Sequence, residues 1–242
     1  MKEILAIIPA RGGSKGLPNK NILPLLGHPL IAYSVKAALD SKLITRVIVS
    51  TDSEAIANVA AQYGAEIAFM RPAEFAQDLS TDLDVFEHAL NWFDINQNYK
   101  PDLVVQLRPT SPIRKAQLID DCITKLINSD ADSLRIVTPS PITPYKMWRI
   151  EDESLPMIPL LSIAGTDEPY NEPRQRLPQT YWQIGTLDVI RPEVILNKKS
   201  MSGKVIMPHI VGNEWAIDID DMSSFIKAAD VILSDNFVKF ND

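Results

Sequence analysis

The chain has 242 residues, 45% of them hydrophobic and 23% charged, which is typical of a globular protein rather than a disordered one. Its formal net charge of −7 argues against nucleic acid as a partner. The single cysteine, Cys122, excludes an internal disulfide and fits a reducing compartment. Met1-Lys2-Glu3 leads straight into an apolar strand, and no apolar run is long enough for a membrane span. We therefore expect a cytoplasmic protein with no membrane partner.

Strand-like and helix-like segments alternate in the first part of the chain. The expected strands are Ile4–Ile8, Arg46–Ser50, Glu66–Met70, Leu103–Leu107 and Ser133–Val137. The expected helices are about Pro29–Ser41, Ser53–Tyr63, Leu83–Asn96 and Lys115–Asn128. Apolar strands alternating with helices predict an α/β fold, in which a Rossmann-like, mostly parallel sheet is covered on both faces. Ligands of such sheets bind at the carboxyl ends of the strands.

A glycine-rich basic segment, residues 8–21, directly follows the first strand. It places the cations Arg11, Lys15 and Lys20 among three glycines. Backbone without Cβ atoms can approach a ligand closely, and fixed cations suit a polyphosphate. The segment lacks the second glycine of a Walker A loop and the helix-opening glycine spacing of a dinucleotide fingerprint. The sequence therefore predicts a triphosphate-binding loop, with an ordinary basic surface turn as the alternative.

Three further strand ends carry candidate ligand contacts. Thr51-Asp52 and Arg71-Pro72 follow two of the expected strands, and Asp52 could equally cap the next helix. Arg108–Arg114 contains two prolines, two arginines and two hydroxyls, which would place polar groups rigidly beside a base, sugar or phosphate. The alternative is a plain strand-to-helix loop with Arg114 in solvent.

Residues 139–178 break the alternation. Eight of the 18 prolines fall in this stretch, which blocks regular helix and central strand. Its apolar residues, including Met147, Trp148, Leu160 and Leu161, are too many for a solvated loop. We expect an inserted excursion that covers its apolar side chains with a partner surface.

The pattern resumes after Tyr181. We expect strands at Thr186–Ile190, Lys204–Met207 and Ala216–Ile219 and a closing helix at Met222–Leu233. On a strand, Asp218 and Asp220 would share one face, and two adjacent carboxylates favour a cation such as Mg²⁺ bound together with phosphates. Alternatively, Asp220 or Asp221 caps the closing helix.

The segment containing Arg11, Ser14-Lys15-Gly16, Pro18 and Lys20-Asn21 resembles the signature of the acylneuraminate cytidylyltransferases, also known as CMP-sialic acid synthetases. The resemblance spans nearly the whole chain. It implies the nucleotide-diphospho-sugar transferase type of fold as a single domain over residues 1–242, with residues 139–178 as a dimerisation subdomain. It further implies a homodimer that transfers CMP from CTP to a sialic-acid-like (nonulosonic) sugar acid and releases pyrophosphate.

The resemblance also implies roles for individual residues. Arg11, Lys15 and Lys20 would hold the triphosphate and, with Asp218 and Asp220 as Mg²⁺ ligands, form the catalytic set. The nucleotide contacts would be Ala10, Arg11, Gly12, Asn21, Arg71, Arg108, Thr110 and Ser111. The contacts to the sugar would be Arg174, at its carboxylate, together with Gln183 and Gly185.

This chain departs from the family pattern at two places. Arg108 stands where the family usually has Gln, and Ile184-Gly185 stands where it usually has Asn-Gly. A site that hydrogen-bonds one sugar discriminates against another, so the acceptor is open at this point. Two other functions also stay open: an enzyme of the same fold that uses another nucleotide such as GTP or a sugar 1-phosphate, and a non-catalytic nucleotide-binding relative.

Overall fold

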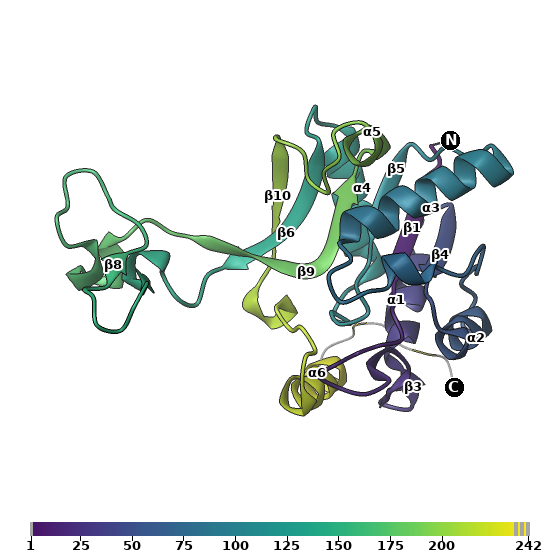
Figure 1. Ribbon diagram of the computed structural model, residues 1–242, viewed down its shortest axis with the longest axis horizontal. Coiled ribbons are helices and arrows are strands. Elements are labelled where there is room, and N and C mark those ends of the chain that lie inside the picture. The colour runs from purple at the N-terminus through teal and green to yellow at the C-terminus, as the bar shows by residue number, and fades with distance from the viewer. Residues whose placement is uncertain (1, 235–236, 238–239, 241–242) are drawn as a thin grey trace.

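A six-stranded sheet forms the centre of the main body, and an arm extends from one side of it, as the computed structural model in Figure 1 shows. The structure describes residues 2–234, 237 and 240. The strands are β1 (Ile4–Pro9), β2 (Pro24–Leu25), β3 (His28–Pro29), β4 (Arg46–Ser50), β5 (Leu103–Gln106), β6 (Ser133–Pro139), β7 (Trp148–Arg149), β8 (Ile158–Pro159), β9 (Tyr181–Ile190) and β10 (Ile206–Ile210). The α-helices are α1 (Leu30–Leu39), α2 (Glu54–Gln62), α3 (Asp82–Gln97), α4 (Ala116–Ile127), α5 (Pro192–Leu196) and α6 (Met222–Ser234).

The order of strands in the main sheet is β10-β6-β9-β5-β1-β4. β1 is parallel to both β4 and β5, and β10 is parallel to β6. β9 runs antiparallel to its neighbours β5 and β6. The chain passes from β1 to one side at β4 and then to the other side at β5. The carboxyl ends of β1 and β5 therefore flank a topological switch point, where such sheets bind ligands.

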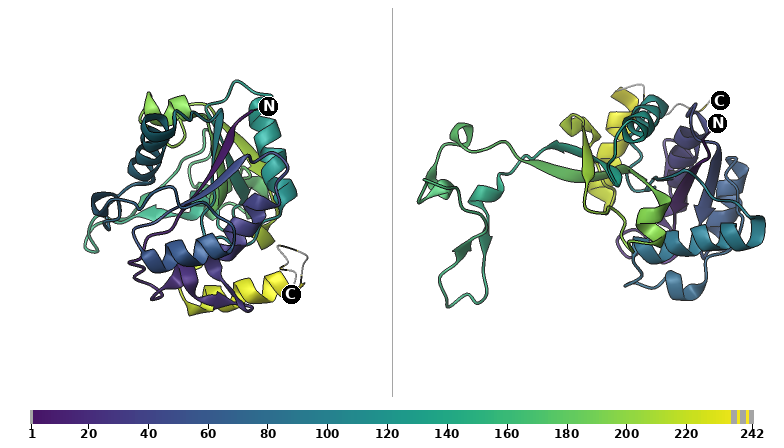
Figure 2. Two further views of the ribbon diagram at one scale, coloured as in Figure 1. Left: turned by 90° about the vertical axis from the view of Figure 1, so that its right-hand side faces the viewer. Right: turned by 90° about the horizontal axis from the view of Figure 1, so that it is seen from above.

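Side chains of alternate strand residues pack into two separate cores. In β1, Ile4, Ala6 and Ile8 join the core under α1, α2, α4 and α6, whereas Leu5 and Ile7 join the core under α3 and α5. Figure 2 shows these helices on the two faces of the sheet. The expectation of an α/β fold with helices on both faces is confirmed.

The five expected helices appear within two residues of their predicted ends, but two expected strands were wrong. Residues 66–70 make one parallel bridge, between Ile48 and Glu66, and then leave the sheet edge to pack Phe69 into a core. Residues 216–219 form no ladder. The backbone N–H of Ile219 donates instead to the carbonyl of Thr110 at 2.8 Å, so this segment joins a loop rather than a strand.

Two other expected strands have different bounds. β10 begins at Ile206 rather than Lys204, because the N–H groups of Lys204 and Val205 donate to the carboxylate of Asp132 at 2.7 and 3.1 Å. β9 begins at Tyr181, five residues before the expected start, because its first part pairs with the end of β6 at the base of the arm.

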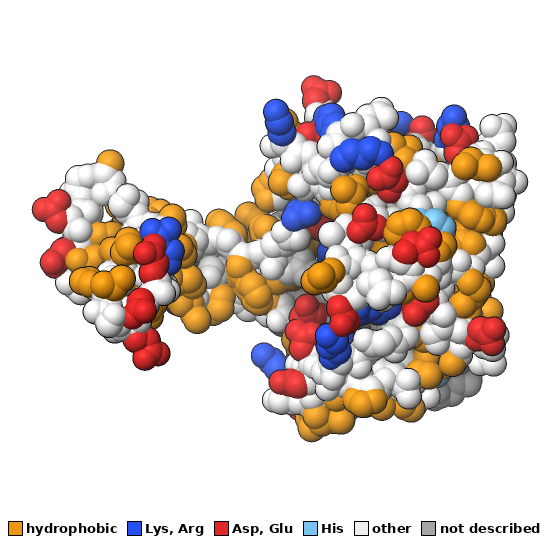
Figure 3. Space-filling model, viewed as in Figure 1, with side chains coloured by type: hydrophobic (Ala, Val, Ile, Leu, Met, Phe, Trp, Pro, Cys, Tyr) orange, Lys and Arg blue, Asp and Glu red, His pale blue; other side chains and the backbone are white. Residues whose placement is uncertain are grey.

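The arm is formed by the proline-rich stretch between β6 and β9. Its β7 and β8 pair with each other as a separate two-stranded sheet, and the rings of Trp148 and Tyr170 lie 4.6 Å apart. Figure 3 shows hydrophobic side chains over its surface. Ile150, Leu160 and Leu161 are among those that are exposed.

Among the described helices of the whole chain, none is long and apolar enough to cross a membrane.

The loop between β5 and α4 is held by a buried guanidinium. Arg114 is fully buried and donates to the Ser34 hydroxyl of α1 at 2.7 Å. It also donates to the carbonyls of Arg108 and Ser111 at 2.7 and 2.6 Å. Burial, with a smaller contribution from the charge of Arg108, lowers the pKa of Arg114 to about 9, which leaves it charged at neutral pH. The alternative interpretation, in which Arg114 faces solvent, is wrong.

Arg114→Met is expected to lower the free energy of unfolding by about 3 kcal/mol, because it leaves three buried hydrogen-bond acceptors without their donor. Urea denaturation followed by circular dichroism measures this change. Arg176→Met is the matched control, because the Arg176 side chain is 75% exposed, and it should stay within about 0.5 kcal/mol of the wild type. Equal stability of the two variants would contradict the structural role of Arg114.

Candidate active site

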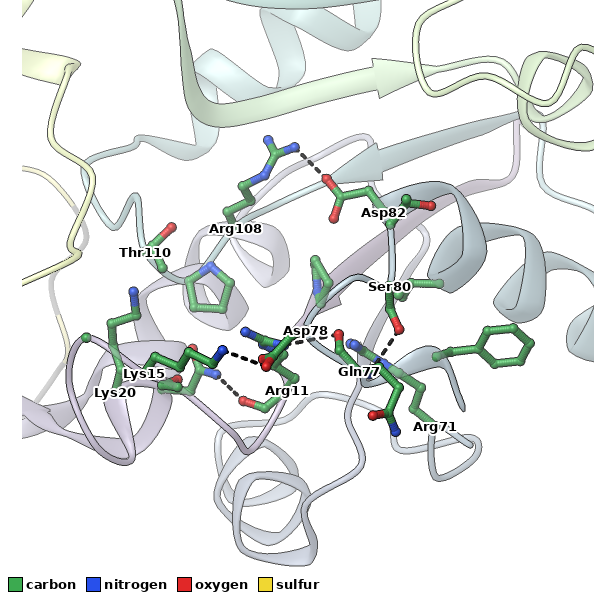
Figure 4. A pocket seen from close by; sticks show the side chains of 18 of the residues that line it. Arg11, Lys15, Lys20, Arg71, Gln77, Asp78, Ser80, Asp82, Arg108 and Thr110 are labelled. Atoms are coloured by element: carbon green, nitrogen blue, oxygen red, sulfur yellow. Dashed lines mark hydrogen bonds and ion pairs between the residues drawn. The ribbon is translucent and has the colours of Figure 1, made fainter. Parts of the chain in front are cut away.

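A cavity of about 470 Å³ opens at the carboxyl ends of β1 and β5, the position predicted from the sheet topology. Figure 4 shows the side chains that surround it. The cavity is bounded by the loop after β1, the segment 71–85 and the loop after β5. Its lining residues are Pro9, Arg11, Ser14, Lys15, Gly16, Lys20, Asn21, Arg71, Phe75, Gln77, Asp78, Ser80, Thr81, Asp82, Val85, Arg108, Pro109, Thr110 and Asp220.

Two of the predicted phosphate-binding cations share one carboxylate. Lys15 Nζ lies 2.6 Å from Asp78 Oδ2, and Arg11 Nη1 lies 3.0 Å from Asp78 Oδ1 (Figure 4). The hydrogen bond from Lys15, together with that from Arg11, lowers the pKa of Asp78 below its ordinary value. Asp78 therefore lies, as an anion, between two of the cations that the sequence predicts to bind phosphate.

The third cation connects the loop after β1 to the acidic segment near the end of the chain. Lys20 Nζ donates to the carbonyl of Ile219 at 2.6 Å and to Asp220 Oδ1 at 3.3 Å. Gly16 lies against the same segment, since a Cβ built on it would be 2.2 Å from the Asp220 carbonyl oxygen. Only glycine fits there without moving the backbone. Residues 200 positions apart thus form one wall of the cavity.

Three predicted nucleotide-binding residues, Ala10, Gly12 and Asn21, belong to the loop after β1, and of these only Asn21 lines the cavity. Asn21 is buried and donates from Nδ2 to the carbonyl of Arg11 at 3.0 Å. The N–H of Gly12 donates to Asp52 Oδ1 at 2.9 Å, so Asp52 anchors the loop, while Ser53 caps α2. Ala10 is buried, and neither Ala10 nor Gly12 lines the cavity.

Arg71 lines the cavity from a buried position. Its Nε donates to the Ser50 hydroxyl at 3.0 Å, and its Nη2 donates to the Ser50 carbonyl. Burial lowers the pKa of Arg71 to about 10, a shift that Asp52 opposes, so the group is a cation at neutral pH. The predicted contact residue is therefore a charged group, fixed against β4, that faces the ligand space.

The loop after β5 brings Arg108 and Thr110 to the cavity and leaves Ser111 buried beside it. Arg108 Nη2 lies 2.7 Å from Asp82 Oδ2, and its Nη1 lies 3.2 Å from Asp188 Oδ2 (Figure 4 shows the Asp82 contact). Burial alone would lower the pKa of Arg108, but Asp82 and Asp188 together raise it. Its guanidinium is thus a permanent cation, held from two sides.

Of the two predicted metal ligands, Asp220 lines the cavity and Asp218 does not. Both are exposed, and the buried side chains of Ile217 and Ile219 keep the alternation expected of the segment without a strand. Asp221 accepts from the N–H of Ser224 at 2.7 Å, which confirms it as the cap of α6. Within the described residues no group of three or more His, Cys, Asp or Glu side chains is arranged around a metal position.

The predicted sugar contacts lie in two different places. Arg174 lines a separate cavity of about 220 Å³ at the base of the arm and donates to the carbonyls of Ser140 and Pro141. Gln183 accepts from Arg135 Nη1 at 2.6 Å on the face of β6 and β9. Gly185 lies beside Ser111 and Arg108, with its missing Cβ 3.1 Å from Ser111 Oγ.

Asp78 and Asp82 are functional-site residues that sequence reasoning missed. Both follow Arg71-Pro72, in a stretch rich in turn-forming and acidic residues that gave no periodic signal. With them, the cavity lining holds the cations Arg11, Lys15, Lys20, Arg71 and Arg108 and the carboxylates Asp78, Asp82 and Asp220. Such an excess of fixed cations at the ends of parallel strands can bind a polyphosphate and stabilise charge on a departing one.

Comparisons with known proteins point to one family. A family model described as cytidylyltransferase matches residues 5–150. The N-acylneuraminate cytidylyltransferase of Escherichia coli O18:K1:H7 is 30% identical over 92% of this chain and 50% of its own length. The CMP-N,N'-diacetyllegionaminic acid synthase of Campylobacter jejuni is 31% identical over 93% of both chains. The chain thus spans about half the length of the first relative and nearly all of the second.

A similar solved structure is that of a CMP:2-keto-3-deoxy-manno-octonic acid synthetase complexed with CTP, with a TM-score of 0.70 over 96% of this chain and 99% of that one. At 16% identity this likeness establishes the fold alone. It bears out the expectation of a nucleotidyltransferase type of α/β fold.

Asp78→Asn is expected to tighten the binding of a nucleoside triphosphate by about two- to tenfold, because the exposed carboxylate no longer competes with the phosphates for Arg11 and Lys15. Isothermal titration calorimetry with CTP measures the change in Kd.

Glu74→Gln is the matched control for Asp78→Asn. Glu74 is exposed, lies four residues earlier in the same segment and does not line the cavity, so its loss removes one negative charge without freeing either cation. Weaker CTP binding by Asp78→Asn, or equal gains in both variants, would contradict the competition between Asp78 and the phosphates.

Proposed function

The chain belongs to the cytidylyltransferase family, and we propose that it activates a sialic-acid-like (nonulosonic) sugar acid with CTP, forming the CMP-sugar and pyrophosphate. Two relatives whose names describe activation of such acids align over at least 92% of this chain, which supports this class of acceptor. The single observation that carries the proposal is the shared cavity of Arg11, Lys15, Lys20 and Asp220. A basic polyphosphate cradle with a carboxylate at its wall fits the transfer of a nucleotidyl group.

Different residues of the cavity are assigned to different parts of the proposed reaction. The acceptor hydroxyl attacks the α-phosphate, and the bond from that phosphate to the departing pyrophosphate breaks. Arg11, Lys15 and Lys20 neutralise the negative charge that collects on the pyrophosphate, and Arg71 and Thr110 lie where they can contact the nucleotide. Positioning and charge neutralisation carry most of the rate in such reactions.

The residues present fit a Mg²⁺ ion bound mainly through the nucleotide. Mg²⁺ in such sites takes one or two carboxylates, with phosphate oxygens and waters completing the shell. Asp220, whose side chain is 80% exposed and lies at the cavity wall, can supply one carboxylate, whereas Asp218, the other proposed ligand, lies outside the cavity lining. When bound, the ion would neutralise phosphate charge. Lys20 contributes by holding the Asp220 carboxylate and the Ile219 carbonyl in place.

The decisive test of the function is a matrix of nucleotides against sugar acids, scored by release of pyrophosphate. We expect release with CTP and a nonulosonic acid together and not with either alone. Release with GTP instead, or none with any pair, would refute the proposed activity. We propose that the reaction takes place in the cytoplasm, because a chain with the single cysteine Cys122 fits a reducing environment.

Lys20→Ala and Asp220→Ala are each expected to lower kcat by about 100-fold or more, as removal of a group that stabilises transition-state charge does. Steady-state kinetics with saturating CTP measures kcat, and melting curves check that the variants fold. Asp230→Ala removes an acidic side chain from α6 that does not line the cavity, and it should retain wild-type turnover. Retained activity in Lys20→Ala would remove that residue from its assigned role.

The arm is the proposed dimerisation subdomain. Its exposed apolar side chains, with Ile150 62% and Leu160 51% accessible, would be covered by a second copy of the chain. Arg174, the proposed contact to the acceptor carboxylate, lies at the arm's base and outside the nucleotide cavity of its own chain. We therefore propose that the arm brings Arg174 toward the site of a partner chain.

Leu160→Glu is expected to convert a dimer into a monomer, because a charge in an apolar interface loses its hydration without a partner. Light scattering after size-exclusion chromatography gives the mass. Ile95→Glu on α3 is the control, because Ile95 is 82% exposed on the main body and should leave the dimer intact. A monomeric wild-type protein would contradict the proposed purpose of the arm.

A further inference from the structure

A second cavity, of about 490 Å³, lies on the outer face of α3 and is separate from the nucleotide cavity. α3 is on the main body, away from the arm of the same chain (Figure 1). Asp84, His88 and Trp92 line the cavity, and because they are four residues apart they share one face of the helix. A cavity of this volume is large enough for a small organic molecule.

Three of the side chains that line the cavity are aromatic rings, those of Phe75, His88 and Trp92. The centre of the His88 ring lies 5.2 Å from that of Phe75 and 4.8 Å from that of Phe69. The Phe69 ring in turn lies 5.2 Å from the ring of Trp92. Aromatic rings pack against flat apolar groups and attract cations at their faces. The cavity therefore offers a surface for a ligand with both features.

The charged residues that line the cavity are acidic. Asp84 and Glu87 are both in the lining, and no lysine or arginine is among the described residues there. Asp84 Oδ2 accepts from the N–H and the hydroxyl of Thr81 at 2.9 and 2.8 Å, and these bonds lower the pKa of Asp84 below its ordinary value. Glu87 is already paired with Lys199. Asp84 is thus the anion that is available to a cationic ligand.

His88 leaves a hydrogen-bonding atom unused in this lining. Its Nδ1 is buried and has no partner among the described residues. Burial, with a smaller contribution from the charge of Arg71, lowers the pKa of His88 below its ordinary value, so the ring is neutral at neutral pH and does not repel a cation. Because buried polar atoms are normally paired, this nitrogen points to a ligand or a water as its partner.

Phe75 connects the two cavities, since it lines both of them. It belongs to a turn that is closed by its own hydrogen bonds, among them one of 3.0 Å from the Ser80 hydroxyl to the carbonyl of Glu74. The same turn carries Asp78, which pairs with two cations of the loop after β1 (Figure 4). A ligand packed on Phe75 would therefore hold the turn, and Asp78 with it, in the arrangement described here.

We propose that the cavity on α3 binds a small organic cation that carries a flat apolar group, and that its occupancy weakens nucleotide binding. The cationic group meets Asp84, and the apolar group packs against Trp92 and Phe75. The bound ligand stabilises the turn in which Asp78 competes with phosphates for the cations of the nucleotide cavity. The cation site goes beyond the proposed function and does not depend on it.

The test begins with three probes that share one ring and differ in charge: 2-phenylethylamine, 2-phenylethanol and 3-phenylpropionate. Each is titrated at neutral pH into the whole ¹⁵N-labelled protein, and NMR gives both the Kd and the amides that shift. We expect the amine to bind with a Kd of about 1 mM or below, as a fragment of this size can. The alcohol should bind about 10-fold more weakly and the anion more weakly still, because they lack the attraction of the rings and of Asp84.

Two variants separate the contribution of the charge from that of the ring. Asp84→Asn should raise the Kd of the amine by about 3- to 10-fold and leave that of the alcohol unchanged. Trp92→Leu should weaken both probes, because both pack against the ring. Asp94→Asn is the matched control, since Asp94 is exposed on α3 and does not line the cavity, and it should change neither Kd. CTP binding by each variant reports that it is folded.

The coupling between the cavities is measured by titrating CTP in the presence of the amine. Saturating 2-phenylethylamine should raise the Kd of CTP by about two- to fivefold, and CTP should raise the Kd of the amine by the same factor, because coupling between two sites is reciprocal. Ethylamine at the same concentration controls for a general effect of salt. Phe75→Leu should reduce the coupling, since it shortens the side chain that the two cavities share.

Several results would overturn the proposal. Equal affinity for the amine and the alcohol, or an unchanged amine Kd in Asp84→Asn, would remove the preference for a cation. No binding of the amine up to about 10 mM, or shifts at the nucleotide cavity in place of α3, would refute the site. A Kd of CTP that stays the same or falls with the amine bound would refute the coupling. None of these measurements uses turnover, so they stand apart from the test of the proposed activity.

Discussion

The buried guanidinium of Arg114 is the interaction on which the candidate active site depends. It fixes two carbonyls of the loop after β5 and ties that loop to α1. The loop in turn contacts two distant segments: the carbonyl of Thr110 accepts from the N–H of Ile219, and Ser111 lies against Gly185 of β9. A charge is costly to bury, and here three hydrogen bonds compensate for that cost. The rigid loop then gives Arg108 a defined place at the cavity wall.

The site as a whole is a balance of fixed charges. Cations from the loop after β1, with Arg71 and Arg108, line the cavity, while Asp78 pairs with Arg11 and Lys15 and Asp82 pairs with Arg108. The ion pairs hold the cations in place, and under the proposed function the phosphates of the nucleotide would replace Asp78. The exposed pairs are weak enough to exchange, whereas the buried Asp188 stays paired with Arg108. The exposed carboxylates can thus give way to another anion while the buried ion pairs keep the cavity wall in place.

Much of the fold could be predicted from the sequence, because apolar periodicity marked the helices and the central strands. The basic glycine-rich loop could also be predicted, because three cations among three glycines are typical of a phosphate-binding loop. Residues 66–70 and 216–219 look like strands by composition but lack a neighbour with which to form a ladder, and local sequence carries no such information. The burial of Arg114 and the place of Asp78 depend on contacts between distant segments. These were beyond prediction for the same physical reason.

The wall formed by Gly16, Lys20 and Asp220 joins the first and last parts of the folded body. A chain growing on the ribosome makes its glycine-rich loop first and the acidic segment about 200 residues later. Local elements can form as they emerge, yet this wall is incomplete until the acidic segment has been translated. If the proposed function holds, the polypeptide therefore cannot catalyse the reaction until the segment containing Asp220 has been made and has folded against the loop.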